Sequence, residues 1–285
     1  MRNKIFGLLI LLILIFSCQQ KTEKKLDINT SANIEFADDK GNKISKTELE
    51  KYTETFSYDA VYYKKNDVTQ LASSFYEQGK KYQKETDNKK AIEEFKKAHK
   101  EAPNWIYPIY NLAVLYLLED DYENALKYYQ LADEIAPKGF YATKVALHTL
   151  QREKVGNLKK GVYKNYLLLE LEGLLTGEGS INRFVNKSAI RELLDEADTF
   201  APIWKDYALF LDTTEEKLNA IEKGLAQDPD IETKGVLLIN KAIFSNENGD
   251  FKKATKILVN VIFDPNSTVS NVEMAKFYLN SIIKK

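Results

Sequence analysis

The sequence predicts an all-α protein in which antiparallel helix pairs stack into a solenoid. The first observation is a block between Ala72 and Lys138 that occurs twice, with its apolar and small residues displaced by 34 positions. The second is a proline that closes each copy. A fixed period of this length is typical of stacked helical hairpins, because each hairpin leaves an apolar face that only its neighbour can cover. The paired positions are Phe75 and Ile109, Gly79 and Ala113, Tyr82 and Tyr116, Ala91 and Ala125, Phe95 and Tyr129, Ala98 and Ala132, and Pro103 and Pro137.

Within each copy the pattern predicts an outgoing helix, a short turn and a returning helix. Asp67 is the expected cap of the first helix, and Asp87-Asn88 marks the first turn. Small residues on the returning helix let the two helices approach closely, while Phe95 fills the space between them. Pro103 and Pro137 should end the returning helices, because proline has no amide proton and disfavours helical geometry in the residue before it.

After residue 138 the pattern weakens. Helices are expected over 140–152 and 158–172, but Lys159 occupies the position where the first two copies have a small residue. Glycines at 173–180 interrupt the array. Further helices are expected over 189–202, where Pro202 is the expected stop, and over 204–212, 216–229 and 249–265. An amphipathic segment over 271–285, ending in lysines, suits a closing cap helix.

These residue patterns resemble the tetratricopeptide repeat (TPR). The first copy carries Gly79, Tyr82, Ala91, Phe95, Ala98 and Pro103 in the motif positions, and the second carries Leu112, Ala113, Tyr116, Ala125, Tyr129, Ala132 and Pro137. The resemblance implies a right-handed α-solenoid and a scaffold that binds other proteins, with two strong repeats and three or four degenerate ones.

The first eighteen residues resemble the signal peptide of bacterial lipoproteins. Arg2 and Lys4 form a basic start, and an apolar run of twelve residues follows, too short for a comfortable membrane span. The run leads into Ser17 and Cys18, the only cysteine of the chain, in the arrangement of a lipobox. The resemblance implies cleavage before Cys18 and attachment of palmitate or a related acyl chain. An ordinary signal peptide or an N-terminal anchor is the alternative reading.

The resemblance also carries an expected location. Gln19 follows the cysteine, where an Asp would commonly retain a lipoprotein in an inner membrane. We therefore expect an outer-membrane anchor facing the periplasm. Surface exposure stays open.

The domain organisation follows from these patterns. We expect a signal peptide over 1–17, a flexible polar tether over 18–31, a small segment over 32–66, TPR-like repeats over 67–172, a linker over 173–187, and degenerate repeats with a cap helix over 188–285. In the small segment, 33–44 is a plausible β-hairpin with Gly41 in its turn. Residues 56–63 fit a strand or a helix.

Partner-binding residues are carried over from the resemblance, which implies that outgoing helices line a concave surface. Aromatic side chains with a few polar and cationic neighbours suit an extended peptide or a helix of a partner protein. An alternative is that several of these tyrosines only pack one repeat against the next. The candidate residues are Tyr76, Lys80, Tyr107, Tyr110, Asn111, Val114, Tyr141, Lys144 and His148.

Some TPR proteins bind a C-terminal carboxylate through Lys, Asn, Asn, Lys and Arg at defined positions. Here only Asn111 matches that set, so the resemblance argues against such a clamp. The corresponding residues are Tyr76, Lys80, Asn111, Tyr141 and Val145.

Other function classes find little support in the sequence. Lys and Arg total 41 against 42 Asp and Glu, so no overall charge favours nucleic acid. His99 and His148 lie in different repeats without a nucleophile or metal-ligand companion. We therefore expect no catalytic residues, metal or cofactor. The alternative is an envelope hydrolase or substrate-binding protein with a site in 32–66 or 173–180, outside the repeats.

Overall fold

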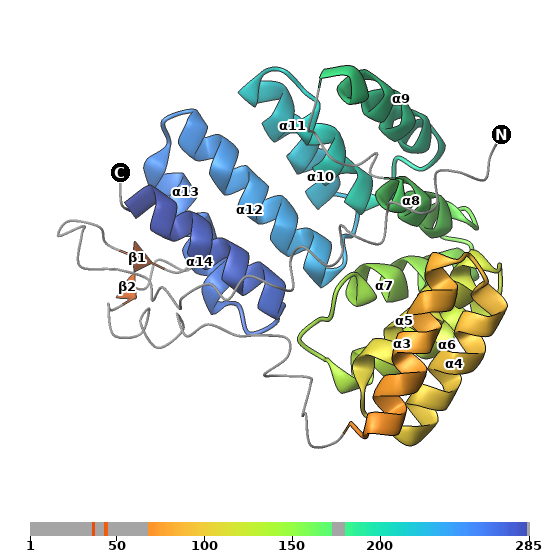
Figure 1. Cartoon of the computed structure of the whole chain (residues 1–285). Helices are drawn as coiled ribbons and strands as arrows, with labels where there is room; N and C mark the ends of the chain where they lie inside the picture. The colour runs from red at the N-terminus through yellow and green to blue at the C-terminus, as the bar shows by residue number, and fades with distance from the viewer. Residues whose placement is uncertain (1–35, 38–42, 45–67, 173–179, 284–285) are drawn as a thin grey trace. The chain divides into compact units, whose positions relative to one another are not determined.

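The helix pairs predicted from the repeat are present and pack as hairpins (Figure 1). The computed structural model describes residues 36–37, 43–44, 68–172 and 180–283. Their contacts divide them into two units. The first unit spans 68–172, and the second contains 180–283 together with the two short strands.

The first hairpin consists of α3 (Gln70–Lys84) and α4 (Asn88–Glu101). The α3 helix begins later than the sequence suggested. Thr69 is its N-cap, with the Thr69 hydroxyl accepting a hydrogen bond of 3.0 Å from the amide of Ala72. The prediction of Asp67 as the cap was wrong, because the Thr69 hydroxyl is the group that meets the free amides of the first turn.

The close approach of α3 and α4 depends on Gly79. A Cβ atom at this position would lie 2.7 Å from the ring of Phe95, which is closer than packed carbon atoms can come. Phe95 is fully buried, as are Ala91 and Ala98 on the same helix. The predicted pattern of small residues around one large ring is therefore confirmed for this hairpin.

The second hairpin, α5 (Ile106–Leu118) and α6 (Tyr122–Ile135), repeats the first down to its turn. Asp87 and Asp121, 34 residues apart, both cap the returning helix with hydrogen bonds of 3.1 Å. The residues before them, Thr86 and Asp120, both have left-handed backbone with φ of 60° and 62°. The 34-residue register thus extends to single backbone angles.

Both prolines follow the ends of their helices as predicted. The α4 helix ends at Glu101, and α6 ends at Ile135, each two residues before its proline. The residues between, Ala102 and Ala136, are buried C-caps.

The third pair, α7 (Thr143–Lys154) and α8 (Val162–Leu171), is shorter than the sequence predicted. The α7 helix begins three residues late, because Tyr141 has a positive φ of 45° and interrupts helical geometry. The α8 helix begins four residues late, after Gly161 with a φ of 92°. Phe140, expected in the helix, is instead a fully buried core residue.

The second unit contains six helices among its described residues. They are α9 (Ser180–Glu196), α10 (Ala201–Leu209), α11 (Thr214–Leu225), α12 (Ile231–Glu247), α13 (Phe251–Phe263) and α14 (Val269–Ile283). The α10 helix packs on α11 and α12 packs on α13, while α14 lies beside both α12 and α13. In Figure 1, α12 and α14 run side by side.

Two expectations for this part of the chain change. Pro202, predicted to stop a helix, lies in the first turn of α10, where its missing amide proton costs nothing. The predicted linker over 173–187 is helical from Ser180 onward, since α9 starts there. Residues 173–179 lie outside the described residues.

The predicted hairpin appears as two short strands, β1 (Phe36–Ala37) and β2 (Lys43–Ile44). They pair antiparallel, with Phe36 opposite Ile44, and β1 lies against α13. The signal peptide, the tether and residues 45–67 lie outside the described residues.

Each unit is a stack of antiparallel helix pairs, so the predicted all-α solenoid is confirmed. In the parts of the chain that the structure describes, no helix is long and apolar enough to cross a membrane.

Candidate partner-binding surface

Four of the predicted binding residues form a connected aromatic surface, which we call the aromatic face: Tyr76, Tyr107, Tyr110 and Tyr141. Tyr76 lies on α3, Tyr107 and Tyr110 lie on α5, and Tyr141 lies just before α7. Tyr76 and Tyr110 are 34 residues apart, and so are Tyr107 and Tyr141. The repeat therefore places equivalent rings on consecutive hairpins.

These rings contact one another across the hairpins. The centroids of Tyr76 and Tyr107 lie 6.4 Å apart, those of Tyr107 and Tyr141 6.5 Å, and those of Tyr110 and Tyr141 5.3 Å. Such distances are those of favourable aromatic pairs. The aromatic face is therefore continuous from α3 to the start of α7.

The same rings also hold the hairpins together. Tyr76 packs on Trp105 at 4.8 Å, and both Tyr107 and Tyr110 pack edge-on against Phe140 at 5.1 and 5.6 Å. Each tyrosine of the aromatic face is half-buried. Part of each ring is thus architecture, as the alternative reading held, and the remaining part is accessible to a partner.

Polar groups on the aromatic face are hydrogen-bond donors at neutral pH. Burial raises the pKa of Tyr76 and of Tyr110 well above 10, so both phenols stay protonated. The amide nitrogen of Asn111 donates to the carbonyl of Tyr107 at 2.8 Å and to the Tyr76 hydroxyl at 3.4 Å. Asn111 thus links α3 and α5 from the middle of the aromatic face.

The predicted cationic residues are paired. Lys80 bridges to Glu77 at 2.8 Å and lies 4.9 Å from the centre of the Tyr76 ring. Lys144 bridges to Asp133 at 2.7 Å. They border the aromatic face as partly neutralised charges rather than as bare cations.

Val114 and His148 differ from the other candidates. Val114 is only 8% exposed, so little of its side chain can contact a partner. His148 is half-buried on α7.

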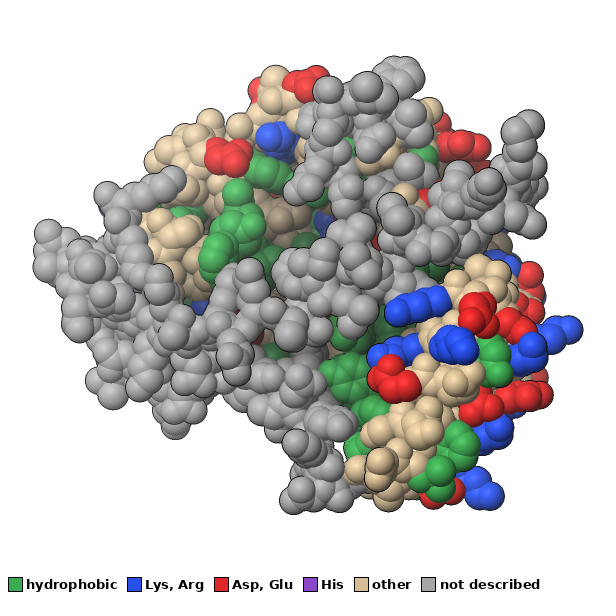
Figure 2. All heavy atoms as spheres, in the orientation of Figure 1, with side chains coloured by type: hydrophobic (Ala, Val, Ile, Leu, Met, Phe, Trp, Pro, Cys, Tyr) green, Lys and Arg blue, Asp and Glu red, His purple; other side chains and the backbone are tan. Residues whose placement is uncertain are grey.

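The lysine runs of the first hairpin are balanced by acids. Lys90 pairs with Asp87 and Lys97 pairs with Glu94, each within one helical turn. Figure 2 shows basic and acidic side chains interspersed over α3 and α4. This mixture is typical of a solvated helix face and differs from a nucleic-acid footprint.

His99 on α4 is half-buried and packs edge-on against Tyr128 at 6.3 Å. Burial lowers the pKa of His99, so its imidazole is neutral at pH 7. Within the described residues, no group of three or more His, Cys, Asp or Glu side chains could hold a metal ion.

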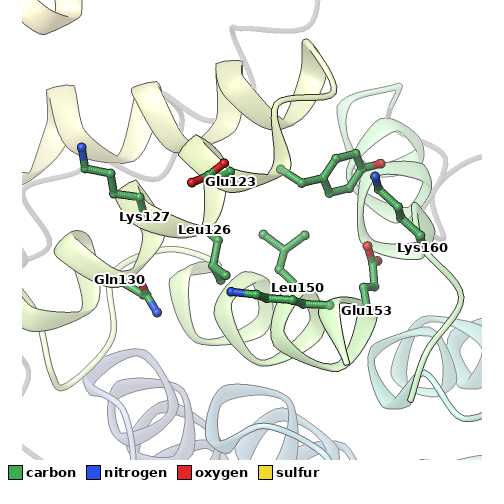
Figure 3. A pocket seen from close by; sticks show the side chains of 9 residues that line it. Glu123, Leu126, Lys127, Gln130, Leu150, Glu153 and Lys160 are labelled. Atoms are coloured by element: carbon green, nitrogen blue, oxygen red, sulfur yellow. The ribbon is translucent and has the colours of Figure 1, made fainter. Parts of the chain in front are cut away.

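Sequence reasoning missed a groove between α6 and α7, which we call the α6–α7 groove (Figure 3). Its volume is about 600 Å³. Leu126 and Leu150 lie at its centre, with Lys127, Gln130 and Lys160 around them. The signal in the sequence was a departure from the 34-residue pattern in the third pair, where Leu150 stands in the position of Tyr82 and Tyr116.

Glu153 closes one end of the α6–α7 groove and is 8% exposed. Its carboxylate accepts hydrogen bonds from the amides of Gly161 at 3.0 Å and Tyr163 at 2.8 Å, which are free donors at the start of α8. Burial raises the pKa of Glu153, while the two amides oppose that rise. Glu153 therefore fixes the turn between α7 and α8.

Comparison with known proteins yields only distant likenesses. No protein-family model matches the chain, and no curated protein matches it. Among solved structures, it is similar to MamA from residue 41 to the end, from Desulfovibrio magneticus RS-1, at 11% identity, covering 72% of this chain and 97% of that chain, with a TM-score of 0.31. An ArsTM double mutant of MamA RS-1 gives 12% identity, covering 73% and 98%, with a TM-score of 0.31.

A third similar structure is YrrB, described as a TPR protein with an unusual peptide-binding site. It shows 12% identity, covers 74% of this chain and 92% of that chain, and has a TM-score of 0.31. At these identities and this TM-score, we transfer no binding property from these proteins. The chain's own helix pairs, caps and 34-residue register establish a solenoid of antiparallel helix pairs.

Proposed function

We propose that this chain is a non-catalytic, lipid-anchored scaffold of the bacterial cell envelope that holds a partner protein against its aromatic face. The anchor rests on the sequence alone, where Cys18 follows a short apolar run and Ser17 as in a lipobox. Gln19 in the next position favours attachment to the outer membrane on its periplasmic side.

The observation that carries the binding role is the continuity of the aromatic face. Its four half-buried rings come from three successive hairpins and contact one another at 5.3 to 6.5 Å. Tyrosines are enriched at protein interfaces because they supply a large contact area with few rotatable bonds and a polar end. A rigid strip of this kind suits a peptide segment or a helix of the partner.

Asn111 supplies the polar group in this strip. Its amide nitrogen is held by the Tyr107 carbonyl and the Tyr76 hydroxyl, so the orientation of its side chain is fixed. Among the described residues, none donates to its side-chain oxygen. That oxygen is therefore available to accept a hydrogen bond from the backbone of a bound segment.

The test is site-specific photocrosslinking in the native envelope. A benzophenone amino acid at position 111 or 80 should crosslink a partner protein, whereas the same amino acid at Lys89, exposed on α4, should not. An equal crosslinking pattern from Lys89 would contradict the proposed surface.

The variant Asn111→Ala/Lys80→Glu should then lose the captured partner with unchanged helicity, while Lys81→Glu, the exposed neighbour on α3, should retain it. This pair is sharper than Tyr107→Ala with Tyr110→Ala, which would also remove rings that pack one hairpin on the next. Retention of the partner by Asn111→Ala/Lys80→Glu would overturn the assignment of the aromatic face.

Lipidation has its own test. Cys18→Ala should abolish fatty-acid labelling and release the chain into the soluble fraction, whereas Cys18→Ala protein that stays in the membrane would contradict the anchor.

A further inference from the structure

Two junctions join the successive hairpins of the first unit. They occupy equivalent positions in the 34-residue register, but a groove lies at the second. At the first junction, between α4 and α5, the ring of Tyr116 on α5 is held by Tyr128 of α6, on which it stacks with centroids 5.5 Å apart and rings 7° from parallel. Lys96 lies over the Tyr116 ring at 5.4 Å. The amide of Asn88 donates to the carboxylate of Glu119 at 2.7 Å and joins α4 to the end of α5. This junction is filled.

The second junction, between α6 and α7, has different residues at the same register. Adding 34 to each number replaces Tyr116 by Leu150 and Lys96 by Gln130. Leu150 lacks the aromatic ring of Tyr116 and is itself buried, with 3% of its surface exposed. The α6–α7 groove, of about 600 Å³, lies at this position.

The hydrogen bond that closes the first junction is also replaced. Glu153 stands in the register position of Glu119, but its carboxylate binds the backbone amides of Gly161 and Tyr163. Tyr122 stands in the position of Asn88. The ammonium group of Lys160 lies over the Tyr122 ring, 4.4 Å from the ring centre. Glu119 therefore links α5 to α4 at the first junction, whereas Glu153 at the second junction binds the start of α8 and makes no such link to α6.

Charged residues at the rim differ between the junctions. Lys127 and Lys154 replace Glu93 and Asp120 of the first junction, and Lys160 adds a third cation, whereas Lys89 is replaced by Glu123. All three lysines are exposed. The opposing acids are Glu123, exposed on α6, and Glu153, whose oxygens are engaged by two amides. The groove thus combines an apolar centre with a rim that favours anions.

We propose that the α6–α7 groove is a second docking site, which takes an acidic segment of a partner protein with an apolar side chain seated on Leu126, the partly exposed leucine of the groove. Carboxylates on either side of that apolar side chain would face Lys127, Lys154 and Lys160. A volume of about 600 Å³ accommodates one or two side chains of such a segment. The site is independent of the aromatic face and of the lipid anchor.

Fluorescence anisotropy with three short labelled peptides tests this proposal on the full-length chain. An Asp-Leu-Asp-Leu-Asp peptide should bind at low salt, and its affinity should fall as salt is added. Lys-Leu-Lys-Leu-Lys tests the charge, and Asp-Ser-Asp-Ser-Asp tests the apolar contact. Both should bind at least about tenfold more weakly, since each lacks one of the two contributions. Equal binding of the acidic and basic peptides would overturn the proposal.

Variants locate the site. Lys154→Glu/Lys160→Glu should weaken binding of Asp-Leu-Asp-Leu-Asp by about tenfold or more. The matched control, Lys89→Glu/Lys100→Glu, makes the same change in net charge at exposed positions of α4 and should leave binding unchanged. An equal loss in the control would show that net charge, not the groove, attracts the peptide, and would overturn the site.

A second variant tests the apolar contact in the groove. Leu126→Ser removes the partly exposed leucine and should weaken binding of Asp-Leu-Asp-Leu-Asp by about tenfold, with circular dichroism confirming the fold. If this variant misfolds, the charge variants alone decide. If it folds and binds as tightly as the parent, the peptide lies elsewhere and the proposal is wrong. Crosslinking from position 111 should be unaffected by either groove variant, which separates this site from the aromatic face.

Discussion

Gly235 on α12 lies directly against Asn271 on α14, so closely that a methyl group at Gly235 would overlap the side-chain amide. Asn271 is fully buried, and its amide nitrogen donates to the carbonyls of Ile231 at 3.3 Å and Glu232 at 3.1 Å. The contact joins α14 to the first turn of α12. Gly235 is therefore required for packing at a site where helix propensity alone would favour alanine.

We expect Gly235→Ala to destabilise the second unit by about 1–3 kcal/mol, because overpacking outweighs the gain of about 1 kcal/mol in helix propensity. Urea unfolding followed by tryptophan fluorescence measures the change. The chain has two tryptophans, Trp105 in the first unit and Trp204 in the second, so Trp105→Phe leaves a reporter for the second unit.

The control for this prediction is a double variant. Asn271→Ala removes the overlapping group, so the cost of Gly235→Ala should shrink in that background. Additive costs of the two substitutions would show that the contact is not the cause.

Glu232 makes the stability of the second unit depend on pH. Burial raises the pKa of its carboxyl to about 7, and Asp230 adds to this, while Thr268 and Ser270 hydroxyls and Lys205 oppose it. In the folded state the carboxyl keeps its proton up to about pH 7, whereas in the unfolded chain it ionises near 4.5. The free energy of unfolding should therefore fall as the pH rises from about 4.5 to 7 and then level off.

The size of this effect has an upper limit of about 3 kcal/mol, from 1.36 kcal/mol for each pH unit between the two pKa values. Glu232→Gln should flatten the dependence, so that the variant is more stable than the parent at pH 8 and similar to it at pH 4. Urea unfolding at both pH values, reported by Trp204, is the measurement. A parent and variant with parallel pH profiles would rule out Glu232 as the source.

Glu153→Ala should loosen the turn between α7 and α8. The substitution leaves the amides of Gly161 and Tyr163 without their acceptor, at a cost of about 1–3 kcal/mol. Hydrogen exchange should become faster over residues 155–166, while α3 and α4 keep their protection. Glu123→Ala, an exposed acid on α6, is the matched control. Unchanged exchange in Glu153→Ala would contradict the capping role.

Thr213 and Glu216 form a capping box at the start of α11. The Thr213 hydroxyl accepts from the amide of Glu216 at 3.2 Å, and the Glu216 carboxylate accepts from the amide of Thr213 at 3.1 Å. Thr213→Ala should cost about 1 kcal/mol of unfolding free energy. Thr213→Asp, which keeps an acceptor, should recover most of it, and failure of this rescue would argue against capping.

The sequence predicted the parts of the fold that depend on short-range chemistry. Turns, caps and proline positions in the first two hairpins follow from local residues. The 34-residue register therefore holds even for the left-handed backbone of Thr86 and Asp120. The third pair did not follow, because its helix starts depend on the backbone of Tyr141 and Gly161 and on the distant carboxylate of Glu153. Pattern alone contains none of these contacts.

The candidate site was predictable only as a set of positions. The 34-residue spacing identified the tyrosines of the aromatic face, but their division into packed and accessible parts depends on Trp105 and Phe140, which come from neighbouring hairpins. The α6–α7 groove was not predicted because it lies where the third pair departs from the 34-residue pattern, at Gln130 and Leu150, and only recurring positions supported a prediction.

The pairing of β1 with the second unit sets how far an anchored chain could extend from a membrane. Phe36 lies eighteen positions after Cys18, and β1 lies against α13, the penultimate helix among the described residues. Fully extended, that many residues reach about 60 Å. If Cys18 carries the proposed lipid, β1 and the second unit lie no more than this distance from the membrane surface. The first unit, with the aromatic face, is joined to the strands through residues 45–67 and to the helices of the second unit through residues 173–179.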